Sequence, residues 1–209
     1  RVIGVEPEGA ACMKASLKAG KVVSLPSAVT IADGTAVKTP GDIVFPYIQK
    51  NLDDIITVED EELIVNFLDV VENHKMVVEN SGLLTVAALK HLDCRDKRVV
   101  SILSGGNMDI ITMSSVVQHG LIERGRVFTV SVQLPDRPGE LVNVANIIAQ
   151  LKGNVIRLEH NQFVSINRNA AVELKITLEA FGHEHKQQIV DALKEKGYDP
   201  KLENPTSLY

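Results

Sequence analysis

The pattern of apolar residues changes near residue 125, and this change constrains the fold more than any other feature of the sequence. Before it, short apolar runs alternate with amphipathic stretches, and the runs that we expect to be strands are residues 2–6, 54–58, 75–79 and 98–104. Continuous apolar runs suit a parallel sheet that is buried on both faces. Residues 1–124 therefore predict an α/β domain whose ligands bind at the carboxyl ends of its parallel strands.

The stretches between these runs predict helices and one long loop. Residues 59–73 and 81–91 each place apolar side chains on one helical face. Thr57 and Asp60 stand where a start signal resembling a capping box is expected for the first of these helices. Residues 24–41 are punctuated by proline and glycine and follow no period. We expect a long loop there, and long loops in compact domains are often functional.

The second half of the chain has the pattern of a separate domain, residues 125–209. The expected elements are strands at 127–134, 154–163, 171–180 and 198–204, helices at 140–151 and 183–196, and a connection at 167–170. The strands alternate apolar and polar residues, as half-buried strands do. The order βαββαβ predicts a ferredoxin-like plait.

Composition narrows the classes of partner. The formal net charge is -5 and the sequence has no basic cluster, which argues against a nucleic-acid or anionic membrane surface. Cys12 and Cys94 lie far apart without metal-ligand spacing, so a reducing, cytoplasmic location is the expectation. No apolar run is long enough for a membrane helix. The first residue is Arg1 within an apolar run, which predicts a fragment or the removal of a preceding segment.

Residues 104–107, Ser-Gly-Gly-Asn, end the last expected strand of the first domain. One interpretation is a tight turn, in which the glycines give backbone freedom and the serine caps a helix. The other is a cofactor site. A serine at the carboxyl end of a strand faces the crevice where cofactors bind, and glycines let a planar ring approach the backbone. The residues alone leave both interpretations open.

Four segments in order, residues 2–11, 30–41, 77–82 and 102–107, are followed by the βαββαβ module. Together they resemble the C-terminal half of threonine ammonia-lyases with one ACT domain. The resemblance covers essentially the whole chain. It implies a partial tryptophan-synthase-β-like sheet, pyridoxal 5'-phosphate as cofactor, and conversion of L-threonine to 2-oxobutanoate and ammonia, or of L-serine to pyruvate. It also implies a homo-oligomer, a dimer or tetramer, in isoleucine biosynthesis or threonine catabolism.

The resemblance assigns cofactor contacts to residues at two expected strand ends. It implies that the Ser104 hydroxyl hydrogen-bonds the pyridine nitrogen and that Gly105 and Gly106 leave room beside the ring. Glu79 matches a glutamate on the cofactor side, and Gly82 lies in the same motif. The alternative for Glu79 is an acid that complements the dipole of the following helix.

The resemblance also implies a cation site at Glu6, Ala10 and Cys12. The glutamate would bind through its side chain and the alanine through its carbonyl oxygen. Cys12 stands where an aspartate or serine is usual, and a thiol is a poor ligand for a hard cation. We therefore expect a monovalent cation, or else no cation and a thiol that is simply packed in the core.

The implied effector site of the ACT domain lies where its first strand turns into its first helix. The matching residues are Asp136, Pro138 and Gly139, with Asn154 on the facing strand. Helix-start amides favour a carboxylate, so an amino acid is the expected effector, with a nucleotide as another. The alternative is a structural turn in a domain that only dimerises.

The lysine that forms the Schiff base with the cofactor, and the glycine-rich loop for its phosphate, have no counterpart in this sequence. The resemblance places both upstream, so we expect this chain alone to be inactive. The rival hypothesis is a non-catalytic regulator in which an α/β scaffold carries an amino-acid-sensing ACT domain. A gene that continues upstream with such a lysine favours the enzyme, and a start codon directly before Arg1 favours the regulator.

Overall fold

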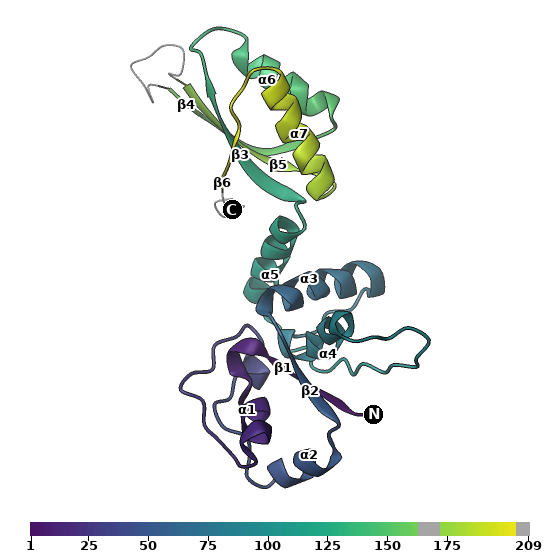
Figure 1. Ribbon diagram of the computed structural model, residues 1–209. Coiled ribbons are helices and arrows are strands. Elements are labelled where there is room, and N and C mark those ends of the chain that lie inside the picture. Colours follow the sequence, from purple (N-terminus) through teal and green to yellow (C-terminus); the bar gives the residue numbers. More distant parts are fainter. Residues whose placement is uncertain (163–171, 204–209) are drawn as a thin grey trace. The chain divides into compact units, whose positions relative to one another are not determined.

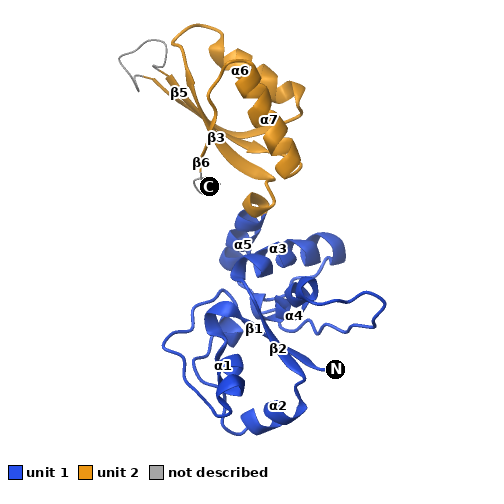
Figure 2. Ribbon diagram, viewed as in Figure 1, with its two compact units in different colours: residues 1–120 blue, residues 121–209 orange. Residues whose placement is uncertain are grey.

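The computed structural model describes residues 1–162 and 172–203, which form two compact units, Arg1–Gly120 and Leu121–Tyr209 (Figure 2). The sequence predicted a boundary after residue 124. In the described residues no helix is both long and apolar enough to cross a membrane.

The first unit contains a pair of parallel strands surrounded by short helices (Figure 1). Strands β1 (Ile3–Pro7) and β2 (Asp54–Val58) pair in parallel along their whole length, which confirms that prediction. The helical elements are η1 (Glu8–Ala10), α1 (Cys12–Ala19), η2 (Asp33–Thr35), α2 (Phe45–Asn51), α3 (Asp60–Asp69), η3 (Val70–His74), η4 (Asn80–Leu83), α4 (Leu84–Ala87), η5 (Ala88–His91) and α5 (Ile110–Glu123).

The predicted helices at 59–73 and 81–91 are confirmed, with differences in their detail. The first is α3 followed by a π turn, η3, and the second is the succession of η4, α4 and η5. The capping box of α3 is formed by Glu59 and Glu62, so the predicted pair Thr57 and Asp60 is wrong. Helices α1, α2 and α5 are not among the elements predicted from the sequence.

The predicted strands at 75–79 and 98–104 are wrong. Both segments lack regular secondary structure, and a single backbone bond joins their ends, from Glu79 N to Gly105 O at 3.3 Å. The side chain of Thr85 takes the place of a ladder partner and donates to the carbonyl of Ile102 at 2.9 Å. An apolar run indicates a tendency to be buried, whereas a strand also needs a neighbour that pairs with its backbone.

The second unit has the predicted βαββαβ order. Its elements are β3 (Val127–Leu134), α6 (Glu140–Gln150), β4 (Asn154–Asn161), β5 (Val172–Glu179), α7 (His183–Glu195) and β6 (Lys201–Glu203). The sheet has the strand order β4-β5-β3-β6, and all of its pairs are antiparallel. Residue 163, the connection at 167–170, residue 171 and residue 204 lie outside the described residues.

The core of the second unit lies between this sheet and helices α6 and α7, which share one of its faces (Figure 1). Alternate residues of β3, from Phe128 to Leu134, are buried against Val144 and Ile148 of α6 and Leu193 of α7. On β3 and β5 the hydroxyls of Thr129 and Thr177 are 2.9 Å apart. The alternation that predicted these strands therefore marks the face that packs on the helices, but on β3 the other face is buried as well, at Val127, Thr129 and Ser131.

Candidate functional site

Two segments that the sequence singled out lie against each other in the first unit. Gly82, in η4, lies so close to the chain after residue 98 that a Cβ there would be 1.7 Å from Ser104 O. Gly105 has φ +76°, and a Cβ on it would lie 2.2 Å from the carboxyl carbon of Glu79. Glu79, Gly82, Ser104 and Gly105 are thus in one place, although neither segment is a strand.

The carboxylate of Glu79 is directed at the turn that follows Ser104. Its Oε2 accepts a hydrogen bond from the Asn107 N–H at 3.3 Å. Glu79 is also the N-cap residue of η4, but its side chain makes no capping bond there. The side-chain contacts therefore do not favour the alternative interpretation, in which Glu79 stabilises the start of the following helix.

The long loop of residues 24–41 reaches the same place. A Cβ on Gly34 would lie 2.8 Å from Ser81 Oγ and 3.6 Å from Glu79 Oε1. A cavity of about 510 Å³ lies beside this contact, and Asp33, Glu79, Asn107 and Asp109 are among the residues that line it. Residues of the loop, of η4, of the segment that begins at Asn107 and of α5 therefore border a common open space.

Polar groups in this region have unused hydrogen-bonding capacity. The Oδ1 of Asn80 and the Oγ of Ser81 are buried and have no partner among the described residues. Ser104 and Gly106 are exposed, and the nearest atom to a Cβ on Gly106 would be Val77 O at 3.8 Å. An exposed hydroxyl, close-packed glycine backbone and unpaired polar atoms fit a flat, polar cofactor such as pyridoxal phosphate.

Sequence reasoning missed the residues that hold these segments together. Asn80 and Asn107 stand directly beside the motifs that were noticed, so their position was the available signal. Asp60 was interpreted as a helix start. Its carboxylate instead accepts hydrogen bonds from the Thr30 hydroxyl at 2.5 Å and the Ile31 N–H at 2.9 Å.

The predicted cation ligands lie around the start of α1. The two carboxylate oxygens of Glu6 accept the N–H groups of Met13 and Lys14, both at 2.8 Å. Ala10 and Cys12 are buried. Burial, and then the nearby Glu6 carboxylate, raise the pKa of the Cys12 thiol, so it stays protonated and is a poor cation ligand. No cluster of three or more acidic, histidine or cysteine side chains suits a metal ion in the described part of the chain.

The predicted effector residues occupy a turn and a strand end of the second unit. Gly139 is the N-cap of α6 with φ +96°, while Asp136 and Pro138 are exposed in the preceding turn. The side chain of Asn154, at the start of β4, donates to Glu179 of β5 at 3.1 Å. The turn thus leaves the first N–H groups of α6 without a side-chain cap, whereas Asn154 already has a partner within the sheet.

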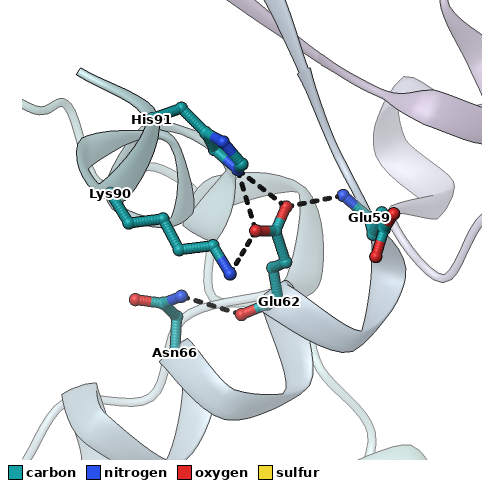
Figure 3. A network of polar contacts seen from close by, with 5 residues as sticks. All are labelled: Glu59, Glu62, Asn66, Lys90 and His91. Carbon is teal, nitrogen blue, oxygen red and sulfur yellow. Dashed lines mark hydrogen bonds and ion pairs between the residues drawn. The ribbon is translucent and has the colours of Figure 1, made fainter.

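A further polar cluster joins α3 to η5, as Figure 3 shows. The side chain of Glu62 is 8% exposed, and it contacts Lys90 and the His91 Nε2, the latter at 2.8 Å. The same carboxylate accepts the N–H of Glu59 at 2.8 Å. These contacts fix the first turn of α3, the turn that also contains Asp60.

Comparison with known proteins agrees with this geometry. The sequence profile of a family described as "Pyridoxal-phosphate dependent enzyme" matches residues 1–105. An L-threonine ammonia-lyase of Geobacter sulfurreducens is 38% identical over 95% of this chain and 50% of that protein. An L-threonine ammonia-lyase of Thermotoga maritima is 34% identical over 97% of this chain and 51% of that protein.

A solved structure, the processed form of threonine deaminase isoform 2 from Solanum lycopersicum, has a TM-score of 0.52 and 31% identity, over 57% of this chain and 36% of that chain. The present chain spans about half the length of these two curated relatives. The family profile covers half of the present chain and includes the segments that meet at Glu79 and Ser104. This chain therefore belongs to the pyridoxal-phosphate dependent enzymes.

Proposed function

We propose that this chain is the C-terminal portion of a threonine ammonia-lyase, which converts L-threonine to 2-oxobutanoate and ammonia and L-serine to pyruvate and ammonia. The observation that carries the proposal is the meeting of Glu79, Gly82, Ser104 and Gly105 beside a cavity. The two curated relatives named above support threonine as the substrate, because both are named L-threonine ammonia-lyase and they match nearly all of the chain.

Ser104 is the proposed hydrogen-bond donor to the pyridine nitrogen of the cofactor. Bound pyridoxal phosphate supplies an electron-withdrawing ring that stabilises negative charge on the substrate α-carbon. A neutral hydroxyl leaves the ring nitrogen largely unprotonated, whereas a carboxylate at this position would keep it protonated. By donating only a neutral hydrogen bond, Ser104 would keep the bound ring a moderate electron sink, which would suit an elimination.

The neighbours of Ser104 place its hydroxyl. The close approach of Gly82 to Ser104 O fixes the backbone on one side, and Glu79 holds Gly105 and Asn107 on the other. The side chain of Glu79 and the backbone of Gly105 and Gly106 then form one wall of the cofactor site. The matching lysine and phosphate loop are assigned by the family resemblance to the preceding part of the protein.

The test uses the complete protein that contains this chain, with pyridoxal phosphate added, and measures 2-oxobutanoate formed from L-threonine. Ser104→Ala should lower cofactor affinity or turnover, on the order of tenfold or more for a lost hydrogen bond in the site. Ser104→Thr retains the hydroxyl and is the matched control. Unchanged activity of the alanine variant would remove Ser104 from this role, and absence of deamination by the unsubstituted protein would refute the function.

We further propose that the second unit is an ACT regulatory domain that pairs with another copy in a homo-oligomer and binds an amino-acid or nucleotide effector. The βαββαβ order and the uncapped start of α6 at Gly139 support this assignment. Isoleucine, valine, threonine and a nucleotide would each be tested for a rise in Tm, because a ligand of the native state stabilises it. Asp136→Ala should abolish the rise if the effector binds at this turn.

A monovalent cation at Glu6 and the carbonyl of Ala10 is a separate proposal. Each Glu6 oxygen accepts one backbone N–H and retains a second lone pair, so coordination and helix capping are compatible. Replacement of K⁺ by a bulky organic cation at constant ionic strength should lower the activity of the complete protein. Equal activity in both salts would remove the cation from the proposal.

A further inference from the structure

Residues 30–34 form a short stretch that borders the candidate cofactor site and is tied to two other elements. Thr30, Ile31 and Asp33 line the cavity beside Glu79, and Ala32 is completely buried. The stretch belongs to a long loop, and apart from η2 it has no regular secondary structure to hold it. Its position is set by the burial of Ala32, by the backbone bond from the Val29 N–H to Gly9 O at 3.0 Å, and by side-chain bonds from elsewhere in the chain.

Asp60, the first residue of α3, makes the stronger of these ties. Its Oδ1 accepts the Thr30 hydroxyl at 2.5 Å and its Oδ2 accepts the Ile31 N–H at 2.9 Å. The Thr30 oxygen in turn accepts the Ala32 N–H at 3.1 Å. One carboxylate thus binds two consecutive residues of the loop through charge-assisted bonds, which are stronger than neutral ones, and the Thr30 hydroxyl extends the link to Ala32.

Asn80 makes the second tie, from the opposite side. Its Nδ2 donates to the carbonyl of Ile31 at 3.0 Å. Asn80 is 5% exposed, and its Oδ1 is left without a partner among the described residues. The bond from Nδ2 to the Ile31 carbonyl orients this amide, although it leaves the buried Oδ1 unpaired at an energetic cost.

These ties bring Gly34 against the cofactor-facing residues. A Cβ on Gly34 would lie 2.8 Å from Ser81 Oγ and 3.6 Å from Glu79 Oε1, so the loop backbone leaves no room for a methyl group beside Ser81 and lies next to Glu79. Glu79 then contacts Gly105 and Asn107 in the turn after Ser104. A displacement of the loop would open space beside Glu79, whose carboxylate accepts the Asn107 N–H of the turn.

The anchoring residue is itself held firmly. The capping box of Glu59 and Glu62 fixes the first turn of α3, and Glu62 is bound by Lys90 and His91 of η5 (Figure 3). Asp60 therefore projects from a helix start that is secured independently of the loop. A carboxylate at that position also interacts favourably with the helix dipole. That interaction alone would give Asp60 only a role in stability.

We propose that Asp60 is a positioning residue of the cofactor site, which holds residues 30–34 so that Gly34 confines Glu79 beside the Ser-Gly-Gly-Asn turn. This inference rests on the proposed function, because it assigns Glu79 and Ser104 to the cofactor. Asp60 does not touch the reacting atoms. Its effect reaches them through Thr30, Gly34 and Glu79.

The test compares four variants of the complete enzyme: Asp60→Ala, Asp60→Asn, Thr30→Val and Thr30→Ser. The two that break the tie, Asp60→Ala and Thr30→Val, should weaken pyridoxal phosphate binding about tenfold and shift the absorption band of the bound cofactor. The tenfold loss corresponds to about 1.4 kcal/mol. Asp60→Asn keeps a hydrogen-bond acceptor and Thr30→Ser keeps the hydroxyl, so both variants should retain most of the affinity for pyridoxal phosphate.

The matched control is Glu61→Ala, which removes the same charge from the same helical turn at an exposed residue. The double variant Asp60→Ala with Thr30→Val should lose less affinity than the sum of the two single losses, because both substitutions remove the bond between Thr30 and Asp60. If Asp60→Ala does not fold, the comparison of Thr30→Val with Thr30→Ser decides the question, since neither changes α3: equal affinity of these two variants would refute the positioning role.

Two outcomes separate the inference from the function on which it rests. If the unsubstituted enzyme binds the cofactor and deaminates threonine, but Asp60→Ala and Thr30→Val match Glu61→Ala in affinity and absorption band, the positioning role is refuted alone. If the unsubstituted enzyme neither binds the cofactor nor deaminates threonine, the proposed function itself has failed.

Discussion

The two adjacent glycines at 105 and 106 should respond very differently to the same substitution. Gly105 has φ +76°, and a Cβ there would lie 2.2 Å from Cδ and Oε1 of Glu79. Gly106 does not have a positive φ, and the atom nearest to a Cβ on it would be Val77 O, 3.8 Å away. Alanine should therefore be excluded at one position and accepted by the protein at the other.

The cost of Gly105→Ala has two sources. The left-handed backbone costs an alanine about 1 to 2 kcal/mol relative to glycine. The Glu79 carboxyl must also swing away, which breaks its bond with the Asn107 N–H and adds about 1 kcal/mol for an exposed, charge-assisted contact. A total of about 2 to 3 kcal/mol, confined to the cofactor site, corresponds to a loss of cofactor affinity on the order of 100-fold.

The assay is titration of the complete apoenzyme with pyridoxal phosphate, alongside urea unfolding of the same samples. Gly105→Ala should lose affinity for pyridoxal phosphate in the titration. In the unfolding experiment, Gly106→Ala should unfold at the same urea concentration as the unsubstituted protein. A smaller loss of affinity in Gly106→Ala alone would indicate that the ring lies against that residue. The reasoning is refuted if Gly105→Ala binds cofactor as tightly as the unsubstituted enzyme.

Three further substitutions or titrations test other contacts. Gly82→Ala would place a Cβ 1.7 Å from the backbone oxygen of Ser104, and since backbone cannot yield cheaply, we expect about 3 kcal/mol of lost stability in urea unfolding. Hydrogen bonds from the hydroxyl and the N–H of Thr112 lower the pKa of Asp109. This contact therefore stabilises the start of α5 fully at pH values above the ordinary Asp pKa of about 4, and the stabilisation is lost as the pH falls through the lower pKa of the folded state. Asp109→Asn should remove the corresponding acid-dependent loss of helical circular dichroism. Burial raises the pKa of Cys12, so its alkylation by iodoacetamide should be slow at neutral pH and fast only after unfolding, and rapid labelling of the folded protein would contradict its burial.

The parts of the fold that could be predicted are those in which local pattern and burial coincide. The alternation in β3 and β5 and the apolar stripes of α6 and α7 identified the second unit, because one face of each element meets a single core. In the first unit the same reasoning found β1, β2 and α3. It failed at 75–79 and 98–104, where Val100 and Ile102 are 88% and 70% exposed rather than paired within a sheet.

The unpredicted helix α5 illustrates the opposite failure. Its first residues, from Ile110 to Thr112, are β-branched and have weak helix propensity. The helix starts there because Asp109 accepts the N–H groups of Ile111 and Thr112, both at 2.9 Å. A single capping residue therefore decided an element that the apolar pattern did not reveal.

The residues of the candidate site that belong to short sequence motifs could be predicted. The residues that contribute through long-range contacts could not. Ser104 and Glu79 stand in short motifs, so resemblance located them and the structure brings them together. Asp60 and Asn80 contribute through partners that are 30 and 49 residues away in sequence. No local pattern encodes such a partner, because the pairing exists only after the chain has folded.

The same long-range ties determine how the site should respond to change. They join loops to helix starts through a few side-chain bonds, whereas the cores of the two units are held by apolar packing around residues such as Phe67 and Leu174. Loss of one tie at Asp60 or Asn80 therefore displaces a loop without opening either core. Cofactor affinity and unfolding free energy should then vary independently, with substitutions at the ties lowering the first and truncation of Phe67 or Leu174 lowering the second.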